Sequence, residues 1–424
     1  MRPAPRNRRS HLLLAATALF VLLTILVARS AYAFSVAGTI DVGEHPEGVA
    51  FDSSNGYLYV TNYDSNTVSV IDGATSSVMT TIDVGTWPQG VAFDAANGDL
   101  YVANNEENTV SVISGSSDTV VKTVSVGSAP EGVAYDSSNG EIYVANFGTG
   151  SKGGSVSVIS GSSNAVVATV TTGAGPTQTA FDPFNGNVYV SSWGSATVDV
   201  ISTSTNTIVT APITAGSEPD GLTVNPSNGD VYLTDYGSNL LEVISGSSND
   251  VIGTASLGTG SEPSADAFDS ATGLIYVADS GTGTVSVIAA SNESIVSSVI
   301  VGAGPAGIAL DTANSNVYVA NSGTGTLSII GSSSSVTSAS STSTPSTTSS
   351  SATSTTTPST TSASATSTST TSNTPSTASS SGIPEFPFEP LAAILATCIL
   401  AAAYLSMRGS KVRGKTASGS RVLS

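Results

Sequence analysis

The sequence predicts an all-β protein whose main domain is a seven-bladed β-propeller of four-stranded antiparallel blades, closed by an N-terminal strand. Three observations predict this fold. A unit of 42 to 46 residues recurs seven times, each unit contains short β-rich runs, and residues 35–43 supply the one run that the last unit lacks. Repeats of about 40 to 50 residues with four strands each are typical of propeller blades. We expect a disordered Ser/Thr-rich stalk and a C-terminal hydrophobic helix to follow.

The N-terminal segment, residues 1–33, has the features of an export signal. An arginine-rich start precedes an apolar run over residues 12–28, and Ala31-Tyr32-Ala33 follows as a small-x-small cleavage site. We expect the mature chain to begin at Phe34. The apolar run has 17 residues, which is long for a cleaved signal, so its retention as a membrane anchor is the alternative.

The propeller is expected over residues 34–330, and its first repeat shows how one blade is built. The run PEGVAFD at 46–52 is followed by a turn at Asn55-Gly56, the run YLYVTN at 57–62 and the run TVSVI at 67–71. Alternating and β-branched runs separated by Gly, Asn, Asp and Ser predict an antiparallel meander. One proline opens each unit: Pro46, Pro88, Pro130, Pro176, Pro219, Pro263 and Pro305.

The two ends of the array predict how the ring closes. Residues 35–43 resemble the run that ends each later unit, whereas the last unit stops after three runs at about residue 330. We expect the N-terminal run to complete the last blade, because pairing the two ends leaves no open sheet edge.

Recurrent polar residues in each unit have structural explanations. An Asp ends the first run and can satisfy nearby backbone N–H groups, a role that Asn225 takes over in the fifth unit. Asn-Gly pairs should supply the positive-φ residues that a tight hairpin needs. The pairs stand at 55–56, 97–98, 139–140, 185–186 and 228–229.

A shared phrase ends the second run of most units. Tyr59-Val60-Thr61-Asn62 and its counterparts, which end at Asn104, Asn146 and Asn321, resemble the YVTN-type β-propeller repeat family of exported bacterial and archaeal surface proteins. The resemblance covers about residues 34–330. Units four to six depart from it at the last position, with Ser192, Asp235 and Asp279. It implies a seven-bladed propeller and a cell-surface or periplasmic setting, but no single activity.

Charge is distributed very unevenly along the chain. The propeller segment holds 29 of the 31 carboxylates against two basic residues, Lys122 and Lys152. Such a surface repels phosphate backbones, so nucleic acid is not expected as a partner. The acidic excess indicates a solvated exterior or an attraction for cations and basic partners.

Residues suited to metal or cofactor chemistry are scarce. The single cysteine, Cys398, lies in the final apolar run, and His45 is the one histidine outside the export signal. The sequence therefore predicts no metal site, no cofactor and no catalytic residues. Carboxylate ligands for calcium are present in the loops, but no Asp-x-Asp-x-Asp pattern supports a defined calcium loop.

The sequence after residue 330 departs from the repeat. Residues 331–382 are almost entirely Ser, Thr, Pro and Ala, which predicts an extended stalk that is a candidate for O-glycosylation. Residues 383–424 carry Pro384-Glu385-Phe386, an apolar run and a basic tail. This order resembles the archaeal PEF-type sorting signal, which implies processing by a sortase-like enzyme. A transmembrane anchor with a cytoplasmic basic tail is the alternative.

Candidate ligand-binding residues gather in two sets of loops that share one propeller face, before the first strand and between the second and third strands. Aromatic side chains among carboxylates suit sugar rings and cationic groups. The candidates are Tyr63, Trp87, Phe147, Trp193, Tyr236, Glu47, Glu131 and Asp220. Packing of the aromatics on neighbouring blades is the alternative interpretation.

These features favour a non-enzymatic binding or adhesion module on the cell surface, anchored to the cytoplasmic membrane through its C-terminus. Its partners would be envelope glycans or proteins. A structural surface-layer component and a carboxylate-based hydrolase or lyase are the alternatives. Asn292-Glu293-Ser294 is a candidate N-glycosylation site.

Overall fold

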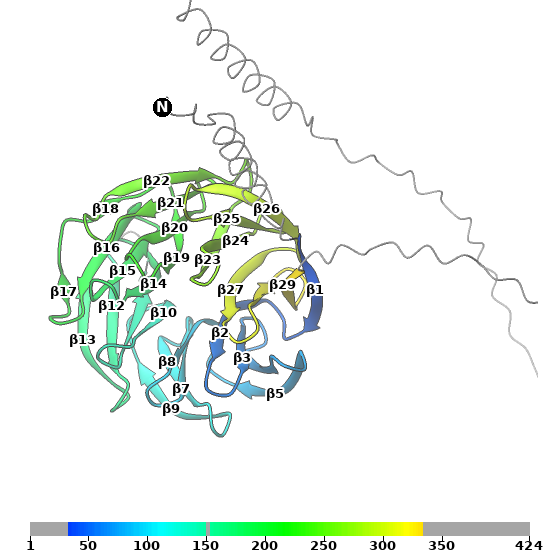
Figure 1. The fold of residues 1–424 in the computed structure, drawn as a ribbon. Coiled ribbons are helices and arrows are strands. Elements are labelled where there is room, and N and C mark those ends of the chain that lie inside the picture. The colour runs from blue at the N-terminus through cyan, green and yellow to red at the C-terminus, as the bar shows by residue number, and fades with distance from the viewer. Residues whose placement is uncertain (1–32, 150–152, 334–424) are drawn as a thin grey trace, which may run out of the picture. The chain divides into compact units, whose positions relative to one another are not determined.

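The structure, a computed structural model, describes residues 33–149 and 153–333, and every regular element within them is a β-strand. Seven antiparallel sheets are arranged as a ring around a central axis (Figure 1). The predicted seven-bladed propeller is confirmed. The predicted export signal, stalk and C-terminal anchor lie outside the described residues, except that Ala33 and residues 331–333 belong to strands.

Each blade has its first strand innermost and its last strand outermost. The innermost strands, which begin at the repeated proline, are β2 (Pro46–Asp52), β6 (Pro88–Asp94), β10 (Pro130–Asp136), β14 (Pro176–Asp182), β19 (Pro219–Val224), β23 (Pro263–Asp269) and β27 (Pro305–Asp311). The second strands are β3 (Tyr57–Asn62), β7 (Asp99–Asn104), β11 (Glu141–Asn146), β15 (Asn187–Ser192), β20 (Val231–Asp235), β24 (Leu274–Asp279) and β28 (Asn316–Asn321).

The third strands are β4 (Thr67–Asp72), β8 (Thr109–Ser114), β12 (Ser155–Ser160), β16 (Thr197–Ser202), β21 (Leu240–Ile244), β25 (Thr284–Ala289) and β29 (Thr326–Ser333). Six blades have an outer strand that follows directly: β5 (Ser77–Asp83), β9 (Thr119–Ser125), β13 (Ala165–Thr171), the pair β17 (Thr207–Ile208) and β18 (Ile213–Thr214), β22 (Val251–Ser256) and β26 (Ser294–Ile300). The fourth blade's outer strand is split near Pro212, which has no N–H to donate to β16.

The seventh blade takes its outer strand from the other end of the chain. β1 (Ala33–Asp41) pairs antiparallel with β29, in the sheet order β1-β29-β28-β27. Ile40 of β1 is buried with Leu327 and Ile329, and the same core includes Leu58 of the first blade. The predicted closure is therefore confirmed, and it joins the last blade to the first.

Neighbouring blades are held together by apolar side chains between their sheets. In one such core, Val68 and Val70 of β4 pack with Leu100 of β7 and Ile113 of β8. The second and third strands are buried on both faces, which explains why their sequences are nearly continuous apolar runs.

The repeated tyrosine and asparagine of the YVTN-like phrase have distinct structural roles. The Tyr59 hydroxyl donates to Asp118 Oδ1 of the next blade at 3.0 Å, so the tyrosine links blades. The buried Asn62 amide donates to Thr67 Oγ1 and Ser69 Oγ at 3.0 Å each. Its Oδ1 accepts from the Gly43 N–H at 3.0 Å, so the asparagine joins the rim loop to two strands.

The first strands end in the predicted Asx turns, but the following hairpins differ from expectation. Asp52 Oδ1 accepts from the Ser54 N–H at 2.8 Å, and Asn225 makes the same bond to Ser227 at 3.0 Å. Gly56 has the predicted positive φ of 80°, whereas Asn55 does not have a positive φ. The asparagine instead accepts from the Tyr57 N–H at 2.8 Å. It therefore fixes a four-residue loop through its side chain rather than through a left-handed backbone.

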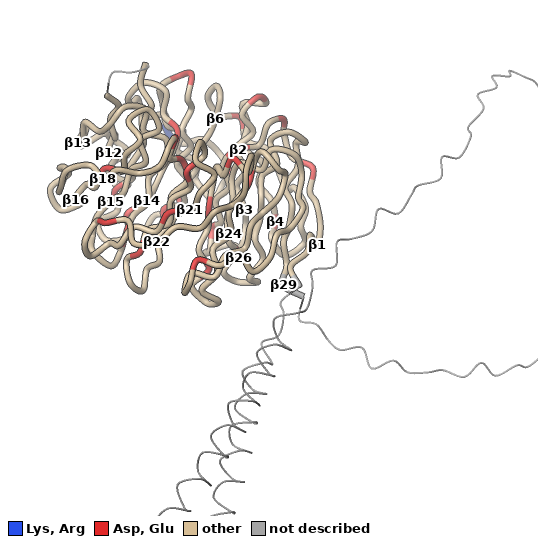
Figure 2. The backbone as a smooth tube through the Cα atoms, turned by 90° about the horizontal axis from the view of Figure 1, so that it is seen from above, with Lys and Arg blue, Asp and Glu red and all other residues tan. Residues whose placement is uncertain are grey.

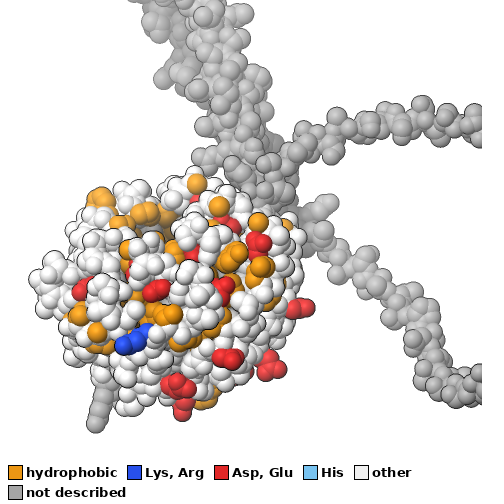
Figure 3. All heavy atoms as spheres, turned by 90° about the horizontal axis from the view of Figure 1, so that it is seen from below, with side chains coloured by type: hydrophobic (Ala, Val, Ile, Leu, Met, Phe, Trp, Pro, Cys, Tyr) orange, Lys and Arg blue, Asp and Glu red, His pale blue; other side chains and the backbone are white. Residues whose placement is uncertain are grey.

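Acidic residues are spread over the ring rather than confined to one side (Figure 2). The face shown in Figure 3 carries scattered acidic and apolar side chains and one basic group. Within the described residues Lys122 is the sole lysine, and no arginine is present. No helix in the described part of the chain is long and apolar enough to cross a membrane.

Candidate functional site

The innermost strands surround a channel at the axis of the ring. The channel has a cavity of about 360 Å³, and each blade lines it with the three residues that follow its opening proline. The repeat itself therefore decides what lines the wall. The residue directly after the proline is Glu47, Gln89, Glu131, Thr177, Asp220, Ser264 or Ala306 in blades one to seven.

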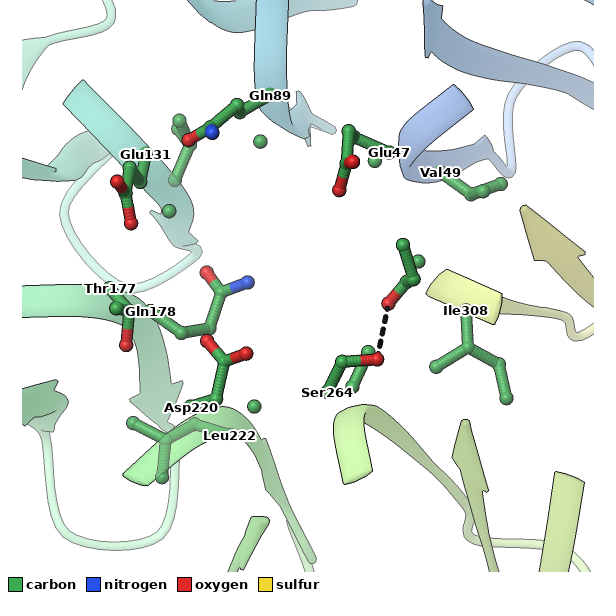
Figure 4. Close-up of a pocket in the computed structure, with 18 of the residues that line it drawn as sticks. Glu47, Val49, Gln89, Glu131, Thr177, Gln178, Asp220, Leu222, Ser264 and Ile308 are labelled. Atoms are coloured by element: carbon green, nitrogen blue, oxygen red, sulfur yellow. Dashed lines mark hydrogen bonds between the residues drawn. The ribbon is translucent and has the colours of Figure 1, made fainter. Parts of the chain in front are cut away.

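Polar side chains surround the open centre of the channel in Figure 4. Of those labelled there, Glu47, Gln178 and Asp220 extend toward the centre, whereas Gln89 and Glu131 lie along the wall and Ser264 is directed toward the next blade. Ser264 donates from Oγ to the Pro305 carbonyl oxygen of the next blade at 3.0 Å. The labelled aliphatic side chains, such as Val49 and Ile308, are directed away from the centre toward the blades.

The second residue after the proline is glycine in most blades because neighbouring inner strands approach closely there. A Cβ added to Gly48 would lie 2.4 Å from the Gln89 carbonyl oxygen, and one added to Gly90 would lie 2.3 Å from that of Glu131. Both distances are far inside van der Waals contact. The glycine therefore sets the width of the channel by allowing backbone-to-backbone packing.

Burial and mutual repulsion perturb the channel carboxylates. Burial, followed by the charges of Asp220 and Glu47, raises the pKa of Glu131 to about 8. Burial and the Glu47 charge raise the pKa of Asp220 to about 7, although a hydrogen bond with Thr177 opposes the shift. The carboxyl groups of Glu131 and Asp220 therefore titrate near neutral pH.

Asp266 is the most unusual group of the channel wall. It is 9% exposed, and neither of its carboxylate oxygens accepts a hydrogen bond from another described residue. Burial and the nearby charge of Asp220 raise the pKa of Asp266 well above its usual range. Valine, leucine, isoleucine or threonine occupies the corresponding position in the other six blades.

The residue before each opening proline adopts a left-handed backbone. Gly175 and Gly304 have φ of 64° and 60°, and glycine suits this conformation. His45 and Trp87 have φ of 55° and 56° at the same position, where a large side chain is disfavoured. A left-handed backbone at a non-glycine residue costs about 1–3 kcal/mol. The backbone conformation therefore does not explain why histidine and tryptophan occupy this position.

Aromatic residues form two groups on the rim loops. Tyr63 stacks on Trp87, with ring centroids 5.4 Å apart and planes at 12°. Trp193 and Tyr236 lie 5.1 Å apart at 43°. Each of these groups joins neighbouring blades, and Trp87 is still 38% exposed. The rim aromatic residues therefore pack between neighbouring blades, and Trp87 also remains accessible to a ligand.

His45 sits between two carboxylates beside the first aromatic group. Its Nε2 lies 3.2 Å from Glu47 Oε1, and its Nδ1 lies 3.1 Å from Asp64 Oδ2. The hydrogen bond to Glu47 is the main cause that raises the pKa of His45 to about 9, against an opposing effect of burial. The protonated imidazole therefore neutralises part of the acidic rim at neutral pH.

Phe147 holds the same rim-loop position as Tyr63, directly after the second strand, but its neighbour in the next blade is a glycine. A Cβ on Gly175 would meet its ring at 3.1 Å, so the ring packs on the loop of the fourth blade. The long loop that follows includes residues 150–152, which lie outside the described residues.

Asn292, the predicted glycosylation site, is exposed in the turn between β25 and β26, and its Oδ1 accepts from Ser294 Oγ at 2.8 Å.

A second acidic feature lies inside the fifth blade, away from the channel. Asp235 and Glu242 occupy the positions that Asn62 and Ser69 hold in the first blade, and they are 0% and 8% exposed. No amide or hydroxyl side chain among the described residues donates to Asp235, whose carboxyl lies beside the Glu242 carboxyl and the Gly216 N–H. Burial and the Glu242 carboxyl raise the pKa of Asp235 to about 8, so the pair holds a proton at neutral pH.

The predicted binding residues thus separate into two neighbouring places. Glu47, Glu131 and Asp220 line the channel, whereas the aromatic candidates lie on the rim loops. Sequence reasoning missed Gln178 and Asp266 as channel residues. Alignment of the seven repeats contains the signal for both, since each departs from the residue type that most blades carry at its position.

Among the described residues, no group of three or more His, Cys, Asp or Glu side chains is arranged to hold a metal ion. The channel carboxylates come from different blades around the wall. The site therefore offers separated negative charges rather than one compact set of ligands.

Comparison with known proteins supports the fold. No protein-family model matches this chain, and no curated protein matches it in sequence. A solved chain titled Kuenenia stuttgartiensis Hydrazine Synthase is similar to it in structure, with a TM-score of 0.63 and 18% sequence identity. The match covers 68% of this chain and 96% of that chain. At this identity the likeness concerns architecture, and the chain is accordingly placed among β-propellers by its fold.

Proposed function

We propose that this protein is a non-enzymatic binding module displayed outside the cell, and that the rim of its propeller binds glycan or protein ligands of the cell envelope. The observation that carries the proposal is the exposed Tyr63–Trp87 stack beside the acidic channel mouth. An aromatic face next to carboxylates suits a sugar ring, which stacks on the aromatic and donates hydroxyl hydrogen bonds.

The backbone around this stack supports a role beyond packing. Trp87 adopts a left-handed conformation that glycine adopts at the same position in two other blades. A bulky residue that is strained in conformation and partly exposed is an expected feature of a binding site. The Trp87 N–H is held by Asn66 Oδ1 at 3.0 Å, so the residue is fixed in place before any ligand arrives.

The external setting rests on the sequence. The export signal expected at residues 1–33, the stalk at 331–382 and the apolar segment before a basic tail form the order of an anchored surface protein. The resemblance to YVTN-type repeats points to the same setting. In this proposal the stalk holds the propeller away from the membrane.

The rim is tested by binding of the purified full chain to an envelope-glycan array and to envelope extracts. Trp87→Ala and Trp193→Ala should each reduce retention at least about fivefold, because a stacking contact contributes about 1 kcal/mol or more. Phe184→Ala is the matched control, since Phe184 is an aromatic residue, 56% exposed, in the loop between β14 and β15 rather than on the rim. Equal retention by all three variants would reject the rim as the binding surface.

A further inference from the structure

Exposed apolar side chains are concentrated on the outer strands of the ring. Among the described residues, every exposed large hydrophobic side chain except Trp87 and Phe184 belongs to an outer strand or to the split outer segment of the fourth blade. A contiguous apolar patch marks an interaction surface, whereas a single exposed apolar residue is ordinary. Six blades present two such residues in succession, which we call the outer apolar pairs: Val78-Met79, Val120-Val121, Val166-Val167, Ile208-Val209, Val251-Ile252 and Ile295-Val296.

The outer apolar pairs stand where the edge of the sheet is blunted. In the third blade the register of β12 and β13 shifts between Val158 and Ile159, so Val167 is the extra residue of a β-bulge. The outer strands of blades one, two, five and six show the same shift, and Pro212 interrupts the outer strand of the fourth blade. Bulges and prolines protect an edge from pairing with a further strand. A partner at this surface is therefore contacted through side chains rather than through added backbone pairing.

Blades three and four form the uncharged side of the ring. Over residues 153–217 the only charged residues are Asp182 and Asp199, and both are buried, at 0% and 3% exposure. The outer apolar pairs Val166-Val167 and Ile208-Val209 therefore lie on a side to which these two blades contribute no exposed charge. The outer strands of the other blades, or the turns that lead into them, carry Asp41, Asp83, Lys122, Asp250 and Glu293.

The uncharged side lies opposite the blade at which the rest of the chain is attached. Ala33, the first residue of β1, pairs with Ser333, the last residue of β29, so both connections are made at the seventh blade. Successive blades are neighbours around the ring, which makes blades three and four the two farthest from the seventh. Their outer strands β13 and β17 follow one another along the outer edge (Figure 1). A partner that docks there approaches the ring away from both connections.

The distribution of charge favours a second copy of this chain as that partner. Lys122 is the only basic residue apart from His45 that the structure describes, so two copies repel each other wherever their acidic surfaces meet. Contact through blades three and four avoids this repulsion. A two-fold contact is also self-complementary, because each copy presents the same two apolar pairs to the other. A basic partner, in contrast, is expected on the acidic parts of the ring.

We propose that the uncharged side of blades three and four is a homodimer interface, in which Val166, Val167, Ile208 and Val209 of one copy pack against the same residues of a second copy. The interface uses the side of the ring and leaves the rim open. This inference therefore does not depend on the proposed glycan or protein ligand.

The test is sedimentation velocity of the purified full chain over concentrations of about 1 to 100 μM, where we expect a reversible monomer–dimer equilibrium. Val167→Glu and Val209→Glu should each weaken dimerisation at least about tenfold, because each places a carboxylate in an apolar contact. Circular dichroism should show an unchanged fold, since both side chains are exposed.

Met79→Glu is the matched control. Met79 holds the same bulge position in the first blade and is 55% exposed, against 53% for Val167. Its substitution should change the dimerisation constant less than about twofold, because the new charge lies outside the interface. Trp87→Ala should also leave dimerisation unchanged, which separates this proposal from ligand binding at the rim.

Cross-linking with a short bismaleimide locates the contact independently. Cys398→Ser removes the single cysteine of the chain, and Val167→Cys in that background should give cross-linked dimers, whereas Met79→Cys should not. If Val167→Glu fails to fold, Val209→Glu and this cross-link decide.

Four results would overturn the proposal. They are the absence of dimers, dimers that persist in both Val167→Glu and Val209→Glu, equal weakening by Val167→Glu and Met79→Glu, and equal cross-linking through Val167→Cys and Met79→Cys. Association through the apolar terminal segments would produce the second of these results. Binding to phosphatidylcholine vesicles that Val167→Glu abolishes, without any change in dimerisation, would assign the surface to lipid instead.

Discussion

At the scale of single residues, the sevenfold repeat provides internal controls for each buried polar group. Asn62 donates to Thr67 and Ser69, and the same amide recurs in three other blades. The fifth blade replaces amide and hydroxyl by two carboxyls, Asp235 and Glu242, and thereby loses the donor. The difference is local, because the backbone pairing of the second and third strands is kept.

Asp235→Asn should stabilise the protein. The new amide can donate to the Glu242 carboxylate, so the pair no longer needs a shared proton. We expect the free energy of unfolding to rise by about 1–3 kcal/mol at pH 8, the typical penalty of a buried group without a partner. Chemical denaturation at pH 8 and pH 5 measures the effect, which should be smaller at pH 5, where the wild-type pair is protonated.

The reciprocal change serves as the control for this prediction. Asn62→Asp removes the amide donor to Thr67 and Ser69 at the corresponding site of the first blade and should destabilise that blade at pH 8. A destabilised Asp235→Asn variant at pH 8 would contradict the role assigned to the acid pair.

At the scale of elements, the closing strand β1 stabilises the whole ring although it is only one of its strands. β1 supplies the outer strand of the seventh blade, and without it β29 presents an unpaired edge. Ile40 of β1 is buried in the core between the seventh and first blades, at 7% exposure, and Phe34 of the same strand packs against Tyr276 of the sixth blade. The ring is therefore closed both by backbone hydrogen bonds and by apolar contact with the first blade.

Ile40→Ala should lower the free energy of unfolding by about 2–5 kcal/mol, because a buried aliphatic side chain is truncated. Val36→Ala in the same strand is the control, since Val36 is 36% exposed and should change stability little.

Deletion of residues 34–43 should lower the melting temperature sharply or produce aggregates. Thermal melts followed by circular dichroism and light scattering measure both effects, and an unchanged melt of the deletion variant would contradict closure by this strand.

At the scale of the whole molecule, the buried acids with perturbed pKa values are all shifted in one direction. The pKa values of Glu131, Asp220, Asp235 and Asp279 are raised by burial to about 8, 7, 8 and 6. An acid whose pKa is higher in the folded than in the unfolded state binds protons more tightly when folded. Its stabilising contribution is complete below the unfolded value near 4 and disappears as the pH rises through the folded value.

The propeller should therefore be more stable at pH 5 than at pH 8. His45 acts in the same direction, since its pKa of about 9 means that its ion pairs persist below that pH. The exposed Asp72, whose pKa is lowered by its hydrogen bond with Thr75, acts the other way from the surface. Melting temperatures between pH 4 and pH 9 measure the profile, and Glu131→Gln with Asp220→Asn should flatten it. A melting temperature that increases from pH 5 to pH 8 would reject this prediction.

The sequence by itself determined the parts of this protein that depend on local pattern. The proline-to-proline period, the strand-ending Asp52 with its counterparts and the orphan run before Pro46 were sufficient to predict seven blades and their closure. Each of these features either involves only a few consecutive residues or recurs unchanged in every unit. The local sequence is therefore sufficient to predict the strands and turns of a blade. The aromatic rim could also be anticipated, because the meander places its loops on one face.

The tertiary structure alone decided which side chains share a site. Tyr63 and Trp87 stack because adjacent blades meet at the rim, and Glu131 and Asp220 share a channel because their blades lie around one axis. The burial of Asp266 and its lack of a donor from any other described residue depend on packing between blades, which no single repeat contains. The desolvation of a carboxyl group and its repulsion by other charges depend on residues that are distant in sequence but close in space. The pKa shifts of the channel acids could therefore be known only from the tertiary structure.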